Sequence, residues 1–235
     1  MSDFSSGLTD ALRLLVGLDP YVYNIIGVSL RVSGAALLLS VLIGIPLGAF
    51  LGLTRFKGKE LVTALLYTGM GFPPVVIGLF VFLLLSSVGP LGHLGWLFSV
   101  RAMIMAQTII AFPLVAGFTM AAVMSVDKNL MKQLRALGAT KTQASWAAIK
   151  EARIGVVVSV IAGFGGIISE VGAVMLVGGN IEGKTRVLTT AIVLETRKGN
   201  FGLAIAFGLI LLTITFVANL SMLRLQRANM NPEEE

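Results

Sequence analysis

The octapeptide GGNIEGKT, residues 178–185, has the residue types and spacing of a phosphate-binding loop. It fits the pattern G-x-x-x-x-G-K-[ST] without a mismatch. In nucleotide hydrolases the backbone N–H groups of such a loop cradle phosphates that the lysine also contacts. That chemistry requires a buried strand before the loop and a helix after it. The flanking segments AVMLV and RVLTTAIVLE have the composition of such elements. Whether the chain hydrolyses a nucleotide must therefore be judged from the rest of the sequence.

Two polar residues inside long apolar stretches form a second candidate group. Glu170 lies in IGVVVSVIAGFGGIISEVGAVMLV, and Gln107 lies in the apolar stretch 102–124. An acid in the middle of a bilayer costs about 2.5 to 3.5 kcal/mol, so Glu170 is expected to face the protein interior or a water-filled path. It could then act as a pathway or gate residue, or as a neutral carboxyl that joins two helices by a hydrogen bond.

The spacing around Glu170 predicts a helix-packing face. One face of a continuous helix would carry small residues and the acid at intervals of four, four and three, at Ala162, Gly166, Glu170 and Ala173. Prolines beside glycines in other apolar stretches suit kinked helices that line a cavity. The residues expected to line a pathway or to pack helices are Gly166, Ser169, Glu170, Gly172, Pro73, Pro74, Gln107 and Pro113.

The composition indicates a membrane protein. The 235 residues are 56% hydrophobic and 13% charged, with a mean hydropathy of +0.90, whereas soluble domains contain about 25% charged residues. Cysteine is absent and His93 is the single histidine, so neither disulfides nor a metal site are predicted. The acids are scattered, which predicts no catalytic site. We attribute the net charge of +6 to membrane topology and expect no nucleic-acid binding.

Five apolar stretches are long enough to cross about 30 Å of hydrocarbon, which takes about 20 helical residues. An all-α membrane domain is expected over residues 21–225, with crossings at about 25–53, 61–88, 102–124, 154–177 and 201–223. Residues 1–20 have too few apolar positions for the core of a signal peptide and are expected to form an amphipathic lead-in. Residues 226–235 are expected to form a polar tail.

The distribution of lysine and arginine predicts the orientation of these crossings. Loops 54–60 and 125–153 share one side of the membrane with the C-terminal tail. That side carries eleven basic residues, against six on the other side. Under the positive-inside rule the N-terminus is therefore outside and the C-terminal tail is cytoplasmic.

This topology argues against ATP hydrolysis by the chain itself. GGNIEGKT falls between the fourth and fifth crossings, on the outer face, where cytoplasmic ATP does not reach it. The preceding AVMLV ends a 24-residue apolar crossing, so it cannot also be the buried strand of a nucleotide-binding sheet. We interpret the motif as a glycine-rich exit from a membrane helix, followed by a basic interfacial segment.

The interval 125–153 is the longest polar stretch and predicts two short helices. Its leucines recur at helical spacing, at Leu130, Leu134 and Leu137. Gly138 can end the first helix, and Thr140 or Thr142 can begin the second. An apolar face on a polar loop needs a surface that buries it. Docking into a groove of a partner protein and attraction to anionic membrane lipid are both open.

Residues 134–155, LRALGATKTQASWAAIKEARIG, resemble the cytoplasmic loop of the inner-membrane permeases of binding-protein-dependent ABC importers. That loop has the pattern E-A-A, three residues, Gly, nine residues, then I-x-L-P. Aligned on Gly138, this sequence has K-Q-L in place of E-A-A, and Ala148 and Glu151 in place of the later Ile and Pro. The segment ISEVGAVMLVGGNIEGKTRVLTTAIVLETRKGNF resembles the molybdate, tungstate and sulfate branch, and most closely the tungstate-uptake permeases. Together the resemblance covers roughly residues 22 to 225.

The resemblance implies a type I ABC importer permease fold in the cell inner membrane, working as a homodimer. It implies two cytoplasmic ABC ATPase subunits that bind Mg-ATP, an extracytoplasmic oxyanion-binding protein, and no cofactor on this chain. The implied ATPase-coupling residues are Leu134, Arg135, Ala136, Leu137, Gly138, Ala139 and Thr140. The candidates for docking the binding protein, or for attracting an anion by their local field, are Lys184, Arg186, Arg197 and Lys198, with interfacial anchoring as their alternative role.

The expected function is the transmembrane subunit of an importer that moves tungstate or molybdate by alternating access. A carboxylate repels a divalent oxyanion, so this function favours a protonated or hydrogen-bonded structural role for Glu170. Two other functions stay open. One is a proton-coupled secondary carrier that uses Glu170, and the other is a membrane NTPase that uses GGNIEGKT.

Overall fold

The computed structural model describes residue 17 and residues 19–228, and all regular structure within them is helical. The helices are α2 (Pro20–Leu53), α3 (Lys59–Met70), α4 (Pro74–Leu85), α5 (Val100–Met124), α6 (Lys128–Ala136), α7 (Lys141–Glu151), α8 (Arg153–Ile168), α9 (Gly172–Gly178), α10 (Leu188–Arg197) and α11 (Phe201–Ala228), with a 3₁₀ turn at Gly92–Leu94. The expected all-α class is confirmed. Most of the predicted lead-in (1–20) and tail (226–235) lies outside the described residues.

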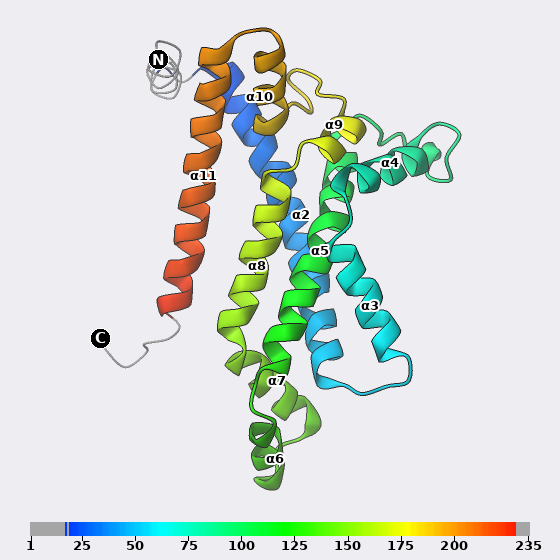
Figure 1. Ribbon diagram of the computed structural model, residues 1–235, viewed down its shortest axis with the longest axis vertical. Coiled ribbons are helices and arrows are strands. Elements are labelled where there is room, and N and C mark those ends of the chain that lie inside the picture. Colours follow the sequence, from blue (N-terminus) through cyan, green and yellow to red (C-terminus); the bar gives the residue numbers. More distant parts are fainter. Residues whose placement is uncertain (1–16, 18, 229–235) are drawn as a thin grey trace.

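Within the described part of the chain, three continuous helices are long and apolar enough to cross a membrane, namely α2, α5 and α11. The first begins sharply because the Asp19 side chain accepts a hydrogen bond of 2.8 Å from the Tyr21 N–H, while Pro20 occupies the first helical position. Figure 1 shows α6 and α7 at one end of the bundle and α10 at the other, with α11 along one side.

The second predicted crossing is bent and the fourth is broken, and up to five crossings remain among the described residues if each bent helix pair counts as one span. The stretch 61–88 forms α3 and α4, whose axes meet at 100°. Pro73 and Pro74 cause this bend, because proline disfavours helix in the preceding residue and supplies no N–H to an earlier carbonyl. The stretch 154–177 forms α8 and the short α9, with a break at residues 169–171. A further bend of 64° separates α7 from α8.

The contact between α2 and α5 is the most extensive in the structure. Gly44, Gly48 and Gly52 recur on α2 at intervals of four residues and face α5. A Cβ atom at Gly48 would overlap the carbonyl oxygen of Ala116, so the two backbones lie closer than a larger residue permits. Helix α8 packs against both α5 and α2, and Ala36, Ala111 and Ile167 form a buried cluster where the three helices meet. These three helices hold the break between α8 and α9 in place.

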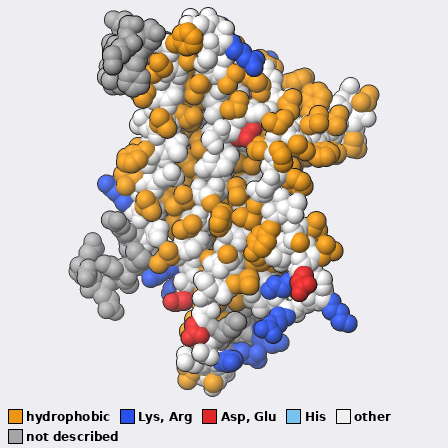
Figure 2. All heavy atoms as spheres, viewed as in Figure 1, with side chains coloured by type: hydrophobic (Ala, Val, Ile, Leu, Met, Phe, Trp, Pro, Cys, Tyr) orange, Lys and Arg blue, Asp and Glu red, His pale blue; other side chains and the backbone are white. Residues whose placement is uncertain are grey.

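Helix α4 extends sideways from the bundle and carries an apolar surface (Figures 1 and 2). On one face Gly78 lies so close to Ala173 of α9 that a Cβ would overlap the Ala173 backbone. Val81 and Leu85 are buried in the cluster that joins α4 to α5 and α9. The opposite face leaves Phe80 exposed, together with Leu79 and Leu83. An apolar surface of this extent is typical of a contact with lipid or with another subunit.

Candidate functional site

The break between α8 and α9 is where buried polar groups converge. The helix ends at Ile168, and two backbone carbonyl oxygens near the break accept side-chain hydrogen bonds. Gln107 Nε2 of α5 donates to the Ile167 oxygen at 3.0 Å, and Thr189 Oγ1 of α10 donates to the Glu170 oxygen at 2.9 Å. Two helices distant in the sequence therefore donate to carbonyls at the break. The Ile167 oxygen also accepts from the Glu170 N–H at 3.2 Å, whereas the Glu170 oxygen accepts from Thr189. Gln107 was predicted as a site residue, whereas Thr189 was not, since nothing in TRVLTTAI distinguishes it from its neighbours.

Glu170 lies within the break rather than on the predicted helix face with Ala162 and Gly166. Its Oε1 accepts a hydrogen bond of 2.8 Å from the Ala173 N–H, so the carboxyl caps the first turn of α9. The side chain is half-buried. The expectation that Gly166, Glu170 and Ala173 lie on one continuous helix is wrong, because the break at residues 169–171 changes the direction of the chain.

The acceptor at Glu170 leads to a prediction with a matched pair of variants. Glu170→Gln keeps an oxygen that can accept from the Ala173 N–H, whereas Glu170→Ala removes it. Loss of a side-chain cap costs about 0.5 to 2 kcal/mol, so we expect Glu170→Ala to melt several degrees lower and Glu170→Gln to melt like the native chain. Thermal unfolding of the purified protein in detergent measures both. Equal melting of all three would show that the cap contributes nothing.

The other residues predicted for a pathway or helix packing lie on α4, α5, α8 and α9 and in the break itself. Gly172 faces Val75, and Gly166 faces Leu114, each too closely for a Cβ without a shift of the neighbour. Ser169 is exposed and donates to the Gly165 oxygen. Pro73 and Pro74 begin α4, and Pro113 is buried within α5. The structure thus brings Gly172 and the region after Pro74 together, while Ser169 faces outward.

The connection 125–153 forms the predicted helix, glycine turn and helix. Asp127 caps α6 by accepting from the Asn129 N–H at 2.9 Å, and Gly138 ends the turn with a φ of +90°, which favours glycine. Thr140 and Gln143 begin α7 by bonding each other's backbone N–H. We call residues 134–140 the elbow.

The elbow and the adjoining α7 carry exposed apolar side chains. Leu137 is 85% exposed, and Trp146 on α7 is 69% exposed. The opposite face of α7 is anchored, because Ala144 and Ala148 are fully buried. A fixed backbone with exposed large apolar groups is an arrangement that another surface can cover. Sequence reasoning missed Trp146, although a tryptophan in a polar loop, eight residues after Gly138, is a usable signal.

The GGNIEGKT loop cannot cradle a phosphate in this structure. The backbone N–H groups of Lys184, Thr185 and Arg186 all bond the Ile181 carbonyl oxygen at 3.2, 2.9 and 3.0 Å. Helix α9 rather than a strand precedes the loop, and α10 begins only at Leu188. The NTPase hypothesis is therefore unsupported, as the topology had indicated. Thr185, which would bind Mg²⁺ in a nucleotide site, is buried and donates to the Gly178 oxygen.

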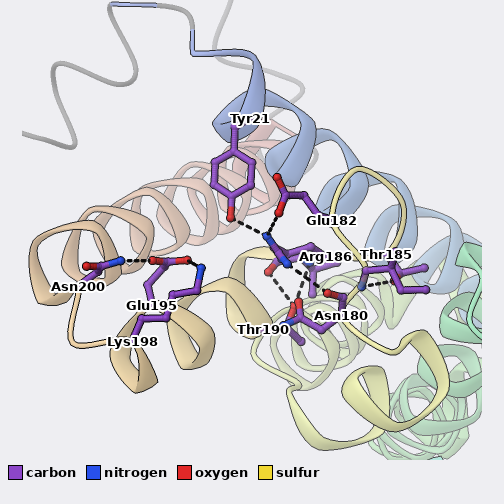
Figure 3. A network of polar contacts seen from close by, with 11 residues as sticks. Tyr21, Asn180, Glu182, Thr185, Arg186, Thr190, Glu195, Lys198 and Asn200 are labelled. Atoms are coloured by element: carbon purple, nitrogen blue, oxygen red, sulfur yellow. Dashed lines mark hydrogen bonds and ion pairs between the residues drawn. The ribbon is translucent and has the colours of Figure 1, made fainter.

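Arg186 holds this loop against the start of α2 (Figure 3). Its NH1 donates to the Tyr21 hydroxyl at 2.8 Å and to Glu182 Oε2 at 2.9 Å, and its guanidinium lies 5.8 Å from the centre of the Tyr21 ring. Arg186 is only 8% exposed. Of the four candidates for docking, Lys184, Arg197 and Lys198 are exposed, although Lys198 also pairs with Glu195, whereas Arg186 is buried and engaged within the chain.

Glu195 is a buried acid at the end of α10 that the sequence did not single out. Its carboxylate accepts from Lys198 at 2.9 Å and from Asn200 at 2.8 Å (Figure 3). Burial alone would raise the pKa of Glu195, but the hydrogen bonds from Asn200 and Lys198, with the charges of Lys198 and Arg186, outweigh it and lower the pKa. The charged form therefore fixes the turn that carries Lys198.

Comparison with known proteins identifies the family of the chain. Residues 44–230 match the family described as binding-protein-dependent transport system inner membrane component. The chain is 46% identical over 204 residues to a probable anion ABC transporter permease protein of Haloferax volcanii, covering 85% of this chain and 88% of that one. It is 41% identical over 230 residues to the tungstate uptake system permease protein TupB of Peptoclostridium acidaminophilum, covering 96% and 99%.

More distant similarities are also to proteins of transport systems. The molybdenum transport system permease protein ModB of Escherichia coli K12 is 31% identical over 189 residues, covering 75% of this chain and 81% of that one. Among solved structures, a chain of the inward-facing MetNI methionine ABC transporter superposes with a TM-score of 0.74 at 19% identity, covering 92% of this chain and 97% of that one. At that identity the likeness shows the fold, which confirms the expected permease architecture.

Proposed function

The chain belongs to the family of inner membrane components of binding-protein-dependent transport systems, and on that premise we propose that it is the transmembrane subunit of an ATP-driven oxyanion importer. The names of two relatives, for tungstate and for molybdenum transport, support tungstate or molybdate as its substrate. As a permease subunit the chain is a non-catalytic, multi-pass protein of the cell inner membrane, and a partner ATPase hydrolyses ATP.

The elbow is the observation that carries this proposal. A polar connection between membrane helices needs no apolar surface, yet Leu137 in the elbow and Trp146 on the adjoining α7 are exposed. We expect these side chains to seat in a groove of the ATPase. Helix α7 continues into α8 through the 64° bend, so a displacement of the elbow would move α8 and the break at its far end.

In this proposal the α6–α7 end lies in the cytoplasm and the α10 end faces outward. Lysine and arginine side chains gather at the α6–α7 end in Figure 2, and Lys132, Arg135 and Lys141 are exposed there. This distribution supports the orientation through the positive-inside rule. At the opposite end, Lys184, Arg197 and Lys198 are proposed to contact the binding protein, with Arg186 fixing the loop that carries Lys184.

We assign the pathway to the interface between two copies of the chain. The exposed apolar face of α4 around Phe80 would then be covered by the second copy or by lipid. Closure of two ATPases on ATP would draw the elbows together and open the pathway outward. The breaks after Gly71 and after Ile168 supply points at which helix segments can turn without unfolding, because their ends are already capped.

Reconstitution of the chain in liposomes tests the proposed function. We expect tungstate or molybdate uptake that requires the ATPase, the binding protein and hydrolysable ATP, and no uptake when a non-hydrolysable ATP analogue replaces ATP. Uptake by the purified chain alone, driven by a pH gradient and abolished in Glu170→Gln, would instead establish a proton-coupled carrier. ATP binding by the chain alone, lost in Lys184→Ala, would revive the NTPase hypothesis.

A further inference from the structure

A small polar cavity lies beside the break, where α2, α5 and the start of α10 meet. Its volume is about 10 Å³, and Ser29, Ser33, Gln107 and Thr189 contribute its polar lining. A cavity on the order of 10 to 15 Å³ holds one water molecule. A tetrahedral oxyanion, with four oxygens around a central atom, needs several times that space. The cavity is therefore not a substrate site in this conformation.

Gln107 has an unsatisfied atom at this place. The side chain is 3% exposed, and its Nε2 donates to the Ile167 carbonyl oxygen at 3.0 Å. This bond fixes the orientation of the amide, because the flipped amide would set two oxygens against each other. Oε1 is then left buried without a hydrogen-bond partner among the described residues. A buried carbonyl oxygen in that state is costly, and most buried polar side-chain atoms have a hydrogen-bond partner in the protein or in ordered water.

The surrounding hydroxyls can accommodate a water molecule but do not themselves reach Oε1. Thr189 Oγ1 donates its proton to the Glu170 oxygen and keeps a lone pair that can accept a hydrogen bond. Ser29 Oγ likewise donates to the Ile25 oxygen at 2.7 Å. The Ser33 hydroxyl makes no hydrogen bond within the described chain, although Ser33 is buried. The Ser33 hydroxyl can donate, Thr189 Oγ1 can accept, and Gln107 Oε1 lacks a partner. Together they are the partners that a water molecule needs.

We propose that this cavity binds one water molecule. The water donates to Gln107 Oε1 and to Thr189 Oγ1 and accepts from the Ser33 hydroxyl. It joins α2 to the two side chains that hold the break, since Gln107 and Thr189 are the residues whose other bonds satisfy the Ile167 and Glu170 carbonyls. The water thus completes a polar network between the first crossing, α5 and α10.

A density map of the native chain in its assembled complex tests the site directly. At a resolution that shows other buried waters, we expect a peak within about 2.6 to 3.2 Å of Gln107 Oε1. An empty cavity in such a map would overturn the proposal. This measurement needs no variant, so it does not depend on the folding of an altered chain.

A double-mutant cycle tests whether the water contributes to stability. We expect Ser33→Ala to lower the melting temperature of the native chain by a few degrees and to have no effect in a Gln107→Leu background, where no oxygen needs the water. Ser221→Ala is the control, because Ser221 Oγ of α11 donates to the Val217 oxygen of its own helix at 2.8 Å, apart from the cavity and from α5. Its effect should be equal in both backgrounds. Equal losses from Ser33→Ala in both backgrounds would contradict the water-mediated link.

Discussion

Leu137→Glu is expected to abolish ATP-driven uptake while leaving the permease folded. Leu137 is 85% exposed in the single chain, so its replacement removes almost no internal contact. In the proposed complex the same side chain is buried, and burying a leucine contributes about 1.5 to 3 kcal/mol. A carboxylate in that groove adds a desolvation cost. Since each 1.4 kcal/mol is about tenfold in affinity, the association should weaken by about 100-fold or more.

Co-purification from native membranes, followed by mass spectrometry, measures this association. The native chain should retain a stoichiometric ATPase, and Leu137→Glu should lose it with an unchanged melting temperature. Leu137→Met keeps an apolar side chain of similar volume and should retain the ATPase. Lys150→Glu changes the charge of α7 away from the elbow and controls for charge alone. Full recovery of the ATPase with Leu137→Glu would show that the elbow is not the coupling surface.

A substitution at Gly138 also tests whether the elbow binds the ATPase, because it changes the backbone geometry of the elbow instead of its apolar contact area. A residue with a Cβ at its φ of +90° is strained by about 1 to 2 kcal/mol, although the Cβ itself would meet open space. Replacement of Gly138 by a bulky charged residue should therefore turn the elbow and release the ATPase without disturbing the bundle. A variant that released the ATPase and also lowered the melting temperature of the bundle would point to misfolding instead.

The parts of this structure that were predictable from sequence are those set by neighbouring residues. The elbow depends on leucines at helical spacing, a glycine after them and a threonine before the next helix, all within residues 130–140. The apolar crossings depend on composition over about 20 residues. Local capping and hydropathy therefore gave the α6–α7 turn and the membrane class correctly.

The break between α8 and α9 was not predictable in this way. Hydropathy averaged over 154–177 is high throughout, and a single glutamate does not interrupt it. What sustains the break is distant in sequence, since Gln107 bonds Ile167 from 60 residues away. The burial of Arg186 is similar, because its partner Tyr21 lies 165 residues earlier. A basic residue in a loop is usually solvated, so without that contact Arg186 is indistinguishable from the exposed Lys184.

Gly48→Ala is expected to destabilise the bundle severely, whereas Gly34→Ala on the same helix should be neutral or stabilising. The new Cβ at Gly48 would overlap the Ala116 carbonyl oxygen, a backbone atom that cannot rotate away. Overpacking of this kind costs about 1 to 3 kcal/mol, and a rigid neighbour places the cost at the upper end. At Gly34 the Cβ meets nothing within 4 Å, and alanine is about 0.5 to 1 kcal/mol better than glycine within a helix.

Thermal unfolding of both purified variants separates packing from helix propensity, because each exchanges glycine for alanine in α2. Gly48→Ala should also reduce uptake beyond its loss of folded protein, since α5 carries Gln107 and its displacement from α2 would pull that amide from the Ile167 oxygen. A Gly48→Ala chain that melts like the native protein would mean that α2 and α5 part easily. The two helices would then be a moving interface, and the rigid support that the break requires would have to come from α8 alone.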